Sequence, residues 1–299
     1  MKVGVLLGGN SSERDVSLSS GAAIINACQE LGYEVLEFDP REGFDSLSID
    51  IKNVDLVFNA LHGGDGENGV ISNELKKLEV KYTGSGKEAS AICINKHASK
   101  EIVKKHNLFT PSWLVLEIGD PIPNTNNVSF PLVVKPNSEG STIGLTIVKD
   151  ESKLTDAIQL ARNYDSTVLI ESFIDGRELT VGIIGEKTYP IVEIIPSHEL
   201  YDYECKYTKG MTDYICPAYI EEKISKTIQK TALKIHQLLK CRHYSRVDFR
   251  LDKNNKAWFL EINTHPGMTE TSLLPKSAAV EGLNFNSLIH KIINEALKK

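Results

Sequence analysis

The chain has 299 residues, 41% of them hydrophobic, so it can bury a large core spread over two or three domains or lobes. Its 34 basic and 40 acidic residues give a net charge of −6 without a long run of one sign, which gives no support to a nucleic-acid or anionic-membrane surface. Its apolar runs are too short for a signal peptide or for the ~20 residues of a membrane span. Five cysteines, an odd number without a CxxC pair, indicate reduced thiols. We therefore expect a cytoplasmic protein that binds small molecules.

The N-terminal segment predicts a parallel α/β layer. The apolar run KVGVLLGG ends at Gly8 and Gly9, a helix follows from about residue 17 to 31, and two more strands, YEVLEFD and VDLVFNA, come after it. Alternating strands and helices are typical of parallel sheets, so residues 1–84 should form one such layer. Ligand-binding groups should then gather in the loops at the strand ends.

Past residue 110 the pattern changes to strands joined by short loops. FPLVVKPNSEGSTIGLTIV predicts two strands joined by a loop that contains Gly140 and Gly144. Asp150 should cap a helix with Leu154 and Ile158 on one face, and TVLIESFIDGRELTVGIIG should supply two further strands.

The polar segment SHELYDYECKYTKGMTDYICPA is too long for a plain connection and suggests a lid over a site. Helical spacing of apolar residues then runs from 221 to 241. We find no internal repeat and no linker-like change in composition.

The stretch VDFRLDKNNKAWFLEINTHPGMT predicts a β-hairpin with an acidic site. If its turn is the four residues 253–256, strand alternation places Asp248 opposite Glu261 and Arg246 opposite Asn263. Facing carboxylates destabilise a sheet unless a cation such as Mg²⁺, bridging to phosphates, lies between them. The alternative is an acidic face that meets water, since a one-residue change in the turn would put an apolar residue opposite Asp248. Alternation also sorts the second strand into two faces, Ala257, Phe259, Glu261 and Asn263 on one and Trp258, Leu260 and Ile262 on the other.

A phosphate site needs a loop to hold the anion. TGSGKEAS is not a Walker A loop, because Lys81 takes the place of its first glycine and Glu88 that of its Ser/Thr. In KPNSEGSTIG, Lys135 ends a strand, and Gly140 and Ser141 let N–H groups and hydroxyls converge on an anion. The alternative reading of this loop is a polar β-turn.

Three further polar residues could carry chemistry, two of them at strand ends. Glu13 follows the first strand, where Asn10 or Ser11 could simply cap the next helix. His62 ends another strand, although a lone histidine is usually structural. Arg246 lies beside the acidic pair and suits charge developing on oxygen, with an ion pair to one of the facing carboxylates as the alternative.

Together these motifs resemble the D-alanine–D-alanine ligases of the ATP-grasp superfamily, over essentially the whole chain. The matching stretches are LLGGNSSERDVSLSSG, ALHGGDGENG, YTGSG, VVKPNSEGSTIG, IESFIDGRELTV, YDYECKYTKGMTDYICPA, RVDF and LEINTHPGMTETSLLP. The resemblance implies a three-lobed α/β ATP-grasp fold: an N-terminal parallel-sheet lobe at 1–84, a central lobe with the phosphate loop at 85–170, and a C-terminal lobe with the metal site and lid at 171–299.

The resemblance also implies ATP and two Mg²⁺ ions, which Mn²⁺ could replace, with ATP held between the central and C-terminal lobes. The residues implied for the nucleotide are Lys96, Lys135 and Lys206 at the phosphates, Glu171, Ser172, Phe173 and Ile174 at the adenine, and Glu178 at the ribose. The implied metal ligands are Asp248, Glu261 and Asn263.

For the amino acids, the resemblance implies a hydrogen-bonded set that closes the lid and an oxyanion site. Glu13 would bind the amino group of the first D-alanine, near His62, and would join Ser141 and Tyr207. The remaining implied residues are Arg246 and the N–H of Gly267 at the oxyanion, and Ser272 and Leu273 at the carboxylate of the second D-alanine.

The implied activity is ATP-dependent ligation of two D-alanines through an acyl phosphate, for peptidoglycan precursors, by an enzyme that forms a homodimer. Where the family pattern usually has Asp and Gln-Gly, this chain has Asn68 and Ser72-Asn73, which concerns a local helix start and a subunit contact. One competing hypothesis is a D-alanine–D-lactate enzyme, against which Tyr207 argues. Another is a nucleotide-binding regulator without turnover, which loss of Arg246 or of a metal ligand would favour, and none is lost.

Overall fold

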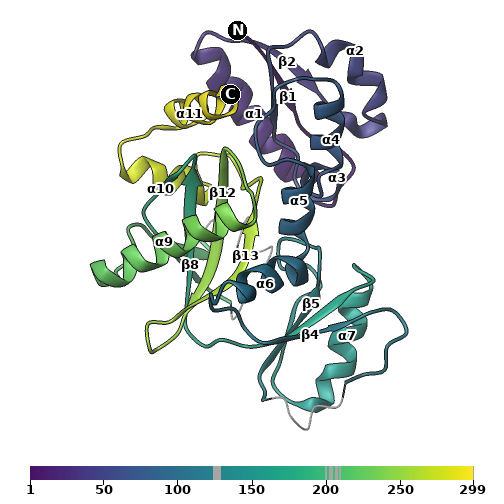
Figure 1. Ribbon diagram of the computed structural model, residues 1–299, viewed down its shortest axis with the longest axis vertical. Helices are drawn as coiled ribbons and strands as arrows, with labels where there is room; N and C mark the ends of the chain where they lie inside the picture. Colours follow the sequence, from purple (N-terminus) through teal and green to yellow (C-terminus); the bar gives the residue numbers. More distant parts are fainter. Residues whose placement is uncertain (124–128, 199–200, 202–204, 206–207, 209, 299) are drawn as a thin grey trace.

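The computed structural model describes residues 1–298 except 124–128, 199–200, 202–204, 206–207 and 209. The described residues form three sheets, each with its own helices, that follow one another along the long axis of the molecule (Figure 1). The N-terminal sheet lies at the top, a six-stranded sheet in the middle and a four-stranded sheet at the bottom. In this part of the chain, no helix has the length and apolar character needed to cross a membrane.

The N-terminal sheet is parallel, as predicted, with strand order β2-β1-β3. Its strands are β1 (Lys2–Leu6), β2 (Glu34–Phe38) and β3 (Leu56–Asn59). Its helices are α1 (Arg14–Glu30), α2 (Ser48–Ile51), α3 (Gly64–Glu67) and α4 (Val70–Lys77). The last helix of the chain, α11 (Phe285–Leu297), returns to pack its buried residues against α1 and the sheet, so both ends of the chain share one core (Figure 1).

The four-stranded sheet is antiparallel, with strand order β4-β7-β5-β6. Its strands are β4 (Trp113–Leu116), β5 (Leu132–Pro136), β6 (Thr146–Val148) and β7 (Val168–Ser172). Helices α5 (Lys87–Ile94) and α6 (Lys96–Lys105) lead into it, and α7 (Leu154–Arg162) covers it with Leu154 and Ile158 buried, as predicted. The Asp150 side chain caps a short 3-10 turn, residues 151–153, which continues into α7.

The six-stranded sheet has the order β11-β10-β8-β12-β13, with β9 paired to β8. Its strands are β8 (Arg177–Ile184), β9 (Lys187–Thr188), β10 (Val192–Pro196), β11 (Thr212–Ile215), β12 (Tyr244–Leu251) and β13 (Ala257–Asn263). Helix α9 (Glu222–Leu238) packs on it, and α10 (Leu273–Val280) lies against β8.

The consecutive strands β7 and β8 belong to different sheets. The chain passes between them at Gly176, where an added Cβ would lie 2.1 Å from the Leu251 carbonyl oxygen, so a side chain does not fit there. Strand β7 crosses the predicted lobe limit at residues 170 and 171 and pairs with the central strands β4 and β5. The lobe limits themselves stay a prediction.

The acidic hairpin has the predicted pairing at the site but a different turn. Asp248 pairs with Glu261 and Arg246 with Asn263, as expected. The turn is nevertheless one residue longer at its N-terminal side, since Leu251 pairs with Ala257. A bulge between Asp248 and Phe249 shifts the register by one residue and so restores the predicted pairs.

This bulge inserts Leu260 and changes which residues share a face. Phe259 and Ile262 are both buried in the core, whereas Leu260 and Glu261 line a cleft. The grouping by strict alternation, which placed Phe259 with Glu261 and Leu260 with Ile262, was therefore wrong. Alternation fails at a bulge because two residues of one strand face one residue of its partner.

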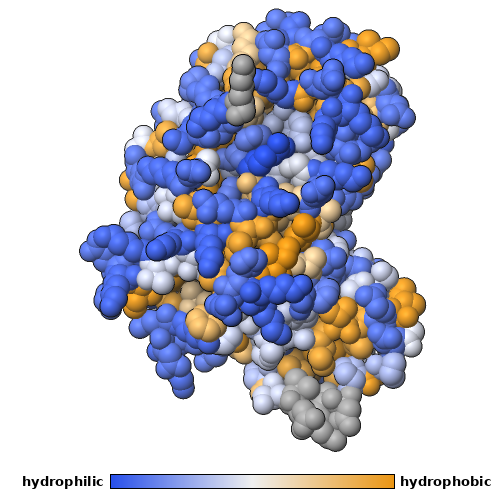
Figure 2. Space-filling view, in the orientation of Figure 1, coloured by the Kyte–Doolittle hydropathy of each residue, from blue (hydrophilic) through white to orange (hydrophobic). Residues whose placement is uncertain are grey.

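The visible surface in Figure 2 is mostly hydrophilic, with apolar residues gathered near the middle of the molecule and on the lobe that carries α7. Exposed apolar side chains of that lobe include Leu114, Ile118 and Leu160. The lobe with the four-stranded sheet therefore exposes several apolar side chains to solvent.

The bulge makes a testable distinction between neighbouring residues. Phe259→Ala should lower the free energy of unfolding by about 3–5 kcal/mol, because Phe259 is fully buried against Phe249. Leu260→Ala should cost less than about 1.5 kcal/mol, because its side chain borders the cleft. Urea denaturation of both variants measures the difference, and an equal or larger cost at Leu260 would contradict the bulge.

Candidate active site

Two adjoining cavities lie between the lobes. The first is lined by residues of the four-stranded sheet, its loop after β5, and strands β8, β12 and β13. The second is lined by the N-terminal lobe, the same loop and the loop between β13 and α10. Arg246, Glu261, Gly140 and Tyr201 line both cavities, so the two spaces meet at the acidic hairpin.

The structure brings the described site residues together in these two cavities. Those lining the first are Lys96, Lys135, Glu171, Ser172, Phe173, Ile174, Glu178, Arg246, Asp248 and Glu261. Those lining the second are Glu13, His62, Ser141, Arg246, Glu261, Asn263, Gly267, Ser272 and Leu273. Lys206 and Tyr207 lie outside the described residues.

A buried carboxylate holds two lysines at the back of the first cavity. Glu171 lies 2.5 Å from the Lys135 amino group and 2.7 Å from that of Lys100. Burial alone would raise the pKa of Glu171, but the charges of Lys100 and Lys135 outweigh it and hold that pKa at about 2. Burial and the nearby charge of Lys135 lower the pKa of Lys100 to about 8, against the attraction of Glu171. With all three groups ionised, the cluster carries one uncompensated positive charge, which favours an anion in the cavity.

Lys96 connects the central lobe to the acidic hairpin. It opens helix α6, whose first turn is capped by the Asn95 side chain. Its amino group donates to the Glu139 carbonyl over 2.6 Å and lies 3.2 Å from the Glu261 carboxylate. One cation thus reaches both the candidate phosphate loop and β13.

Arg246 forms an ion pair with Asp248, which was the alternative to a guanidinium free for catalysis. Its Nε and Nη2 atoms donate to the two carboxylate oxygens of Asp248, over 3.0 and 2.9 Å. Thr180 on β8 donates its hydroxyl to the same carboxylate over 2.5 Å. Burial would lower the pKa of Arg246, but Asp248 outweighs burial and raises it, so the guanidinium stays charged. Arg246 still lines both cavities.

The donor set at the hairpin fits a divalent cation. Asp248 and Glu261 face each other across the strand pair, and Asn263 adds an amide oxygen on the same hairpin. Hard oxygen donors of this kind are the ligands of Mg²⁺. Among the described residues, no three His, Cys, Asp or Glu side chains are grouped so that they could hold a metal by themselves. Such a site suits Mg²⁺, which commonly binds through one or two carboxylates and substrate phosphates.

The far end of the first cavity pairs charge with an aromatic ring. Arg250 lies 3.0 Å from the Glu178 carboxylate, and its guanidinium carbon lies 6.0 Å from the centre of the Phe173 ring. Glu178 and Phe173 come from the strand β8 and the segment before it, so Arg250 ties the β7–β8 connection to β12.

In the second cavity, the phosphate loop meets the N-terminal lobe. Ser141 donates its hydroxyl to the Glu13 carboxylate, which brings together two members of the predicted three-residue set. Ser141 and Thr142 both have positive φ values, 49° and 63°, which let the loop turn toward the cavity. Thr142 also donates to the Tyr201 carbonyl over 2.7 Å, so the loop contacts the start of the predicted lid.

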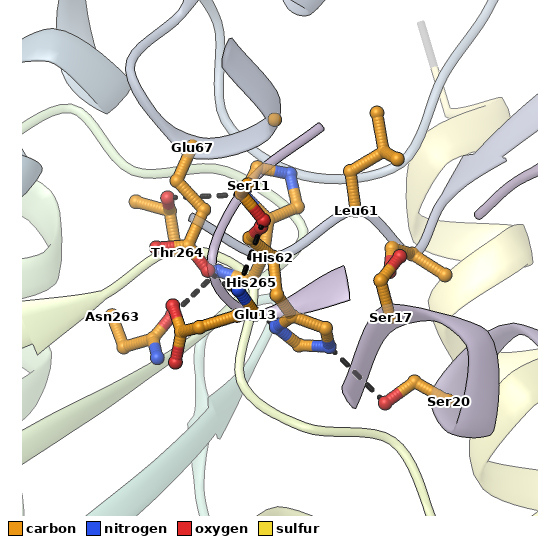
Figure 3. Close-up of polar contacts among 12 residues, drawn as sticks. Ser11, Glu13, Ser17, Ser20, Leu61, His62, Glu67, Asn263, Thr264 and His265 are labelled. Carbon is orange, nitrogen blue, oxygen red and sulfur yellow. Dashed lines mark hydrogen bonds and ion pairs between the residues drawn. The ribbon is translucent and has the colours of Figure 1, made fainter. Parts of the chain in front are cut away.

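His62 is buried at the centre of a polar cluster (Figure 3). Its Nε2 atom lies 3.1 Å from the Ser20 hydroxyl, and its Nδ1 atom lies 3.5 Å from the Glu67 carboxylate. Burial would raise the pKa of Glu67, but the hydrogen bond and charge of His62 hold it below its usual value. His62 is therefore fixed on both sides, beside the candidate amino-acid site.

The loop between β13 and α10 is held by the Ser272 side chain. Thr269 donates its backbone N–H to the Ser272 hydroxyl over 3.0 Å. An added Cβ at Gly267 would lie 3.1 Å from that same oxygen, so a side chain at Gly267 would be tight. Ser272 and Leu273 open helix α10, where the N-terminal N–H groups favour a carboxylate.

Sequence reasoning missed several residues that line or support these cavities, notably Lys100, Ser20, Glu67 and Tyr201. Lys100 could have been found from its position, since it lies four residues after Lys96 and shares its helix face. Ser20 gave no such signal, because its partners His62 and Met268 are distant in sequence.

Three α/β lobes that enclose a lysine-lined cavity beside an acidic hairpin are the fold and site of an ATP-grasp ligase. The family model described as the D-Ala–D-Ala ligase C-terminus matches residues 102–294. The D-alanine–D-alanine ligase of Aquifex aeolicus is 45% identical over 98% of this chain and 100% of its own length. The chain belongs to the D-alanine–D-alanine ligase family.

Solved structures agree with this assignment. The Bacillus anthracis D-alanine–D-alanine ligase complexed with ATP has a TM-score of 0.88 and 33% identity, over 99% of this chain and 97% of that one. The VanG D-Ala:D-Ser ligase of Enterococcus faecalis has a TM-score of 0.85 and 26% identity, over 99% of both chains. These similarities confirm the predicted ATP-grasp fold and family, and with them a ligase that uses ATP.

The lysine cluster predicts a pH-dependent stability. Glu171→Gln should lower the free energy of unfolding at pH 7 by about 3–5 kcal/mol, because two buried lysines lose their carboxylate. The folded pKa of Glu171 lies below its ordinary value of 4.5, so its contribution is present above pH 4.5 and is lost toward pH 2. The difference in the free energy of unfolding between wild type and Glu171→Gln should therefore narrow as the pH falls from 5 to 3.

Urea denaturation across that pH range measures the gap. Glu101→Gln serves as the control, because Glu101 is 39% exposed and lies 4.0 Å from Lys105, so its effect should stay within ~0.5 kcal/mol. If Glu171→Gln were as stable as wild type at pH 7, or if its loss of stability grew toward pH 3, the paired cluster would be contradicted.

Proposed function

We propose that this enzyme joins two D-alanine molecules into D-alanyl-D-alanine, with ATP converted to ADP and phosphate, as a step toward peptidoglycan precursors. The observation that carries the proposal is the meeting of the two cavities at Arg246 and Glu261. A carboxylate bound beside Glu13 would there face a phosphoryl group held by the lysines. Family membership supports the same activity.

The first cavity would hold the nucleotide. Lys96 and Lys135 would contact the phosphates, together with Lys206, and their charge would offset that of the phosphoryl group in transfer. The segment Glu171 to Ile174 would line the adenine, and Glu178 would bind the ribose. Since the Glu171 side chain already pairs with Lys100 and Lys135, its part would be to fix Lys135 in the cavity.

Asp248, Glu261 and Asn263 would hold two Mg²⁺ ions, or Mn²⁺, against the phosphates. Such ions would supply charge neutralisation for the phosphoryl group in transfer. In the protein alone, Arg246 and Lys96 offset the charges of Asp248 and Glu261. The carboxylates are thereby held in place, ready to act as ligands.

The second cavity would hold the amino acids. Glu13, held by the Ser141 hydroxyl, would bind the ammonium group of the first D-alanine, with His62 beside it. The carboxylate of this D-alanine would attack the γ-phosphorus of ATP, which forms an acyl phosphate and releases ADP. The amine of a second D-alanine, whose carboxylate would lie at Ser272 and Leu273, would then attack the acyl carbon and release phosphate.

Arg246 and the N–H of Gly267 would stabilise the oxyanion of this tetrahedral intermediate. Water must be kept out, because it would hydrolyse the acyl phosphate. The segment 201–218 would serve as the lid, with Tyr207 joining Ser141 and Glu13 on closure. The contact of Thr142 with the Tyr201 carbonyl supports a lid that lies on the phosphate loop.

The homodimer, the cytoplasmic location and the absence of nucleic-acid or membrane partners are retained as proposals from the family resemblance and the composition. No described contact bears on the Asn68 and Ser72-Asn73 differences as a subunit interface.

The central test is product formation. With ATP, Mg²⁺ and D-alanine, phosphate release should equal dipeptide formed, and L-alanine should give neither. When D-alanine competes with D-serine or D-lactate as second substrate, D-alanyl-D-alanine should predominate from pH 6 to 9. Chromatography of the products measures this, and a D-serine or D-lactate product in the majority would move the enzyme to that acceptor class.

A further inference from the structure

A buried serine links the N-terminal lobe to the loop that carries Gly267. Ser20 lies on α1 and is 0% exposed. Its hydroxyl accepts a hydrogen bond from the backbone N–H of Met268 over 3.2 Å. The same hydroxyl lies 3.1 Å from Nε2 of His62 (Figure 3). One side chain of the first lobe therefore contacts both the candidate substrate histidine and the candidate oxyanion loop.

The Ser20 hydroxyl makes two contacts. Its oxygen accepts the hydrogen of the Met268 N–H. It also shares a hydrogen bond with Nε2 of His62, whose other ring nitrogen, Nδ1, lies 3.5 Å from the Glu67 carboxylate. Glu67, His62, Ser20 and the Met268 N–H thus form one continuous series of contacts.

The position of Met268 gives this series a consequence for the chemistry. Its N–H belongs to the peptide that follows Gly267, so the Ser20 contact fixes one of the two peptide planes at that glycine. Glycine has wide conformational freedom, so its N–H keeps one direction only when neighbouring groups hold it. The Met268 side chain is 2% exposed in a core that includes residues of α1, so side-chain packing holds the loop to the same helix.

We propose that Ser20 is a positioning residue, which aims the Gly267 N–H at the reacting carbonyl by anchoring the next peptide to the lobe that binds the first D-alanine. This inference rests on the proposed function, since it assigns Gly267 to the oxyanion. Through Ser20, the oxyanion loop is placed relative to His62 by a direct contact between lobes.

The test compares Ser20→Ala with Ser17→Ala. Ser17 is a matched control, because it is equally buried on the same helix, and its hydroxyl contacts Gly8 and Ala60 inside the N-terminal lobe. Removing one oxyanion donor costs about 10²- to 10³-fold in kcat, so displacing it should cost on the order of tenfold. We therefore expect Ser20→Ala to lower kcat by about tenfold, with the KM for ATP unchanged.

The ratio of products gives the more specific readout. Slower attack by the amine leaves the acyl phosphate to water, so Ser20→Ala should release more than one phosphate per dipeptide. Ser17→Ala should keep a ratio of one, and Ser20→Thr, which retains the hydroxyl, should restore the wild-type ratio. A ratio of one in Ser20→Ala, or the same kcat as in Ser17→Ala, would overturn the proposal.

Amide hydrogen exchange separates this proposal from the proposed function, because it needs no turnover. The Met268 amide should exchange about tenfold faster in Ser20→Ala than in wild type, and unchanged exchange would overturn the anchoring. Where alanine prevents folding, Ser20→Cys, similar in size but a weak acceptor, should show the same acceleration. If the wild type forms no dipeptide, the proposed function fails, and exchange still decides whether Ser20 holds the loop.

Discussion

The site depends on one constraint, which is that strands β12 and β13 hold two carboxylates directly opposite each other. Asp248 and Glu261 would repel each other in an isolated hairpin. Each has its own cation in this structure: Arg246 pairs with Asp248 on the same strand, and Lys96 reaches Glu261 from helix α6. These cations offset the repulsion. Lys96 also donates to the Glu139 carbonyl of the phosphate loop, so it links the hairpin to the central lobe.

The two sides of the first cavity differ in charge. The hairpin side presents two carboxylates, each paired with one cation, whereas the side formed by Lys100, Lys135 and Glu171 carries one uncompensated positive charge. A polyphosphate with divalent cations would complement both sides, with negative charge for the lysines and positive charge for the carboxylates. Its binding would replace the internal ion pairs of Lys96 and Arg246 with contacts to the substrate.

The sequence predicted local features well, and the pairing of Asp248 with Glu261 followed from alternation together with an assumed four-residue turn. It did not predict how that pairing arises, because a longer turn and the Leu260 bulge compensate each other, and a bulge leaves no periodic signal. The separation of β7 and β8 into two sheets depends on the close approach of Gly176 to Leu251, which is a long-range contact. The return of α11 to the N-terminal core depends in the same way on packing between the two ends of the chain.

The site residues show a similar division. The motifs singled out Glu13, Ser141 and Arg246, and the family resemblance implied that Ser141 joins Glu13. The structure brings these two residues together across 128 positions of the chain. The partners that fix these residues were missed, namely Lys100 for Glu171 and Ser20 for His62. Such supporting contacts join separate elements, so their sequence spacing carries no regular pattern.

The most direct test of the account is calorimetric titration of Mn²⁺ into the protein with and without a non-hydrolysable ATP analogue. Two carboxylates and an amide oxygen form an incomplete ligand set, so tight Mn²⁺ binding should require the analogue and its phosphates. Glu261→Gln should lose this nucleotide-dependent binding, whereas Glu270→Gln, an exposed residue on the loop before α10, should retain it. Equally tight Mn²⁺ binding by Glu261→Gln would contradict a metal site built on the facing carboxylates.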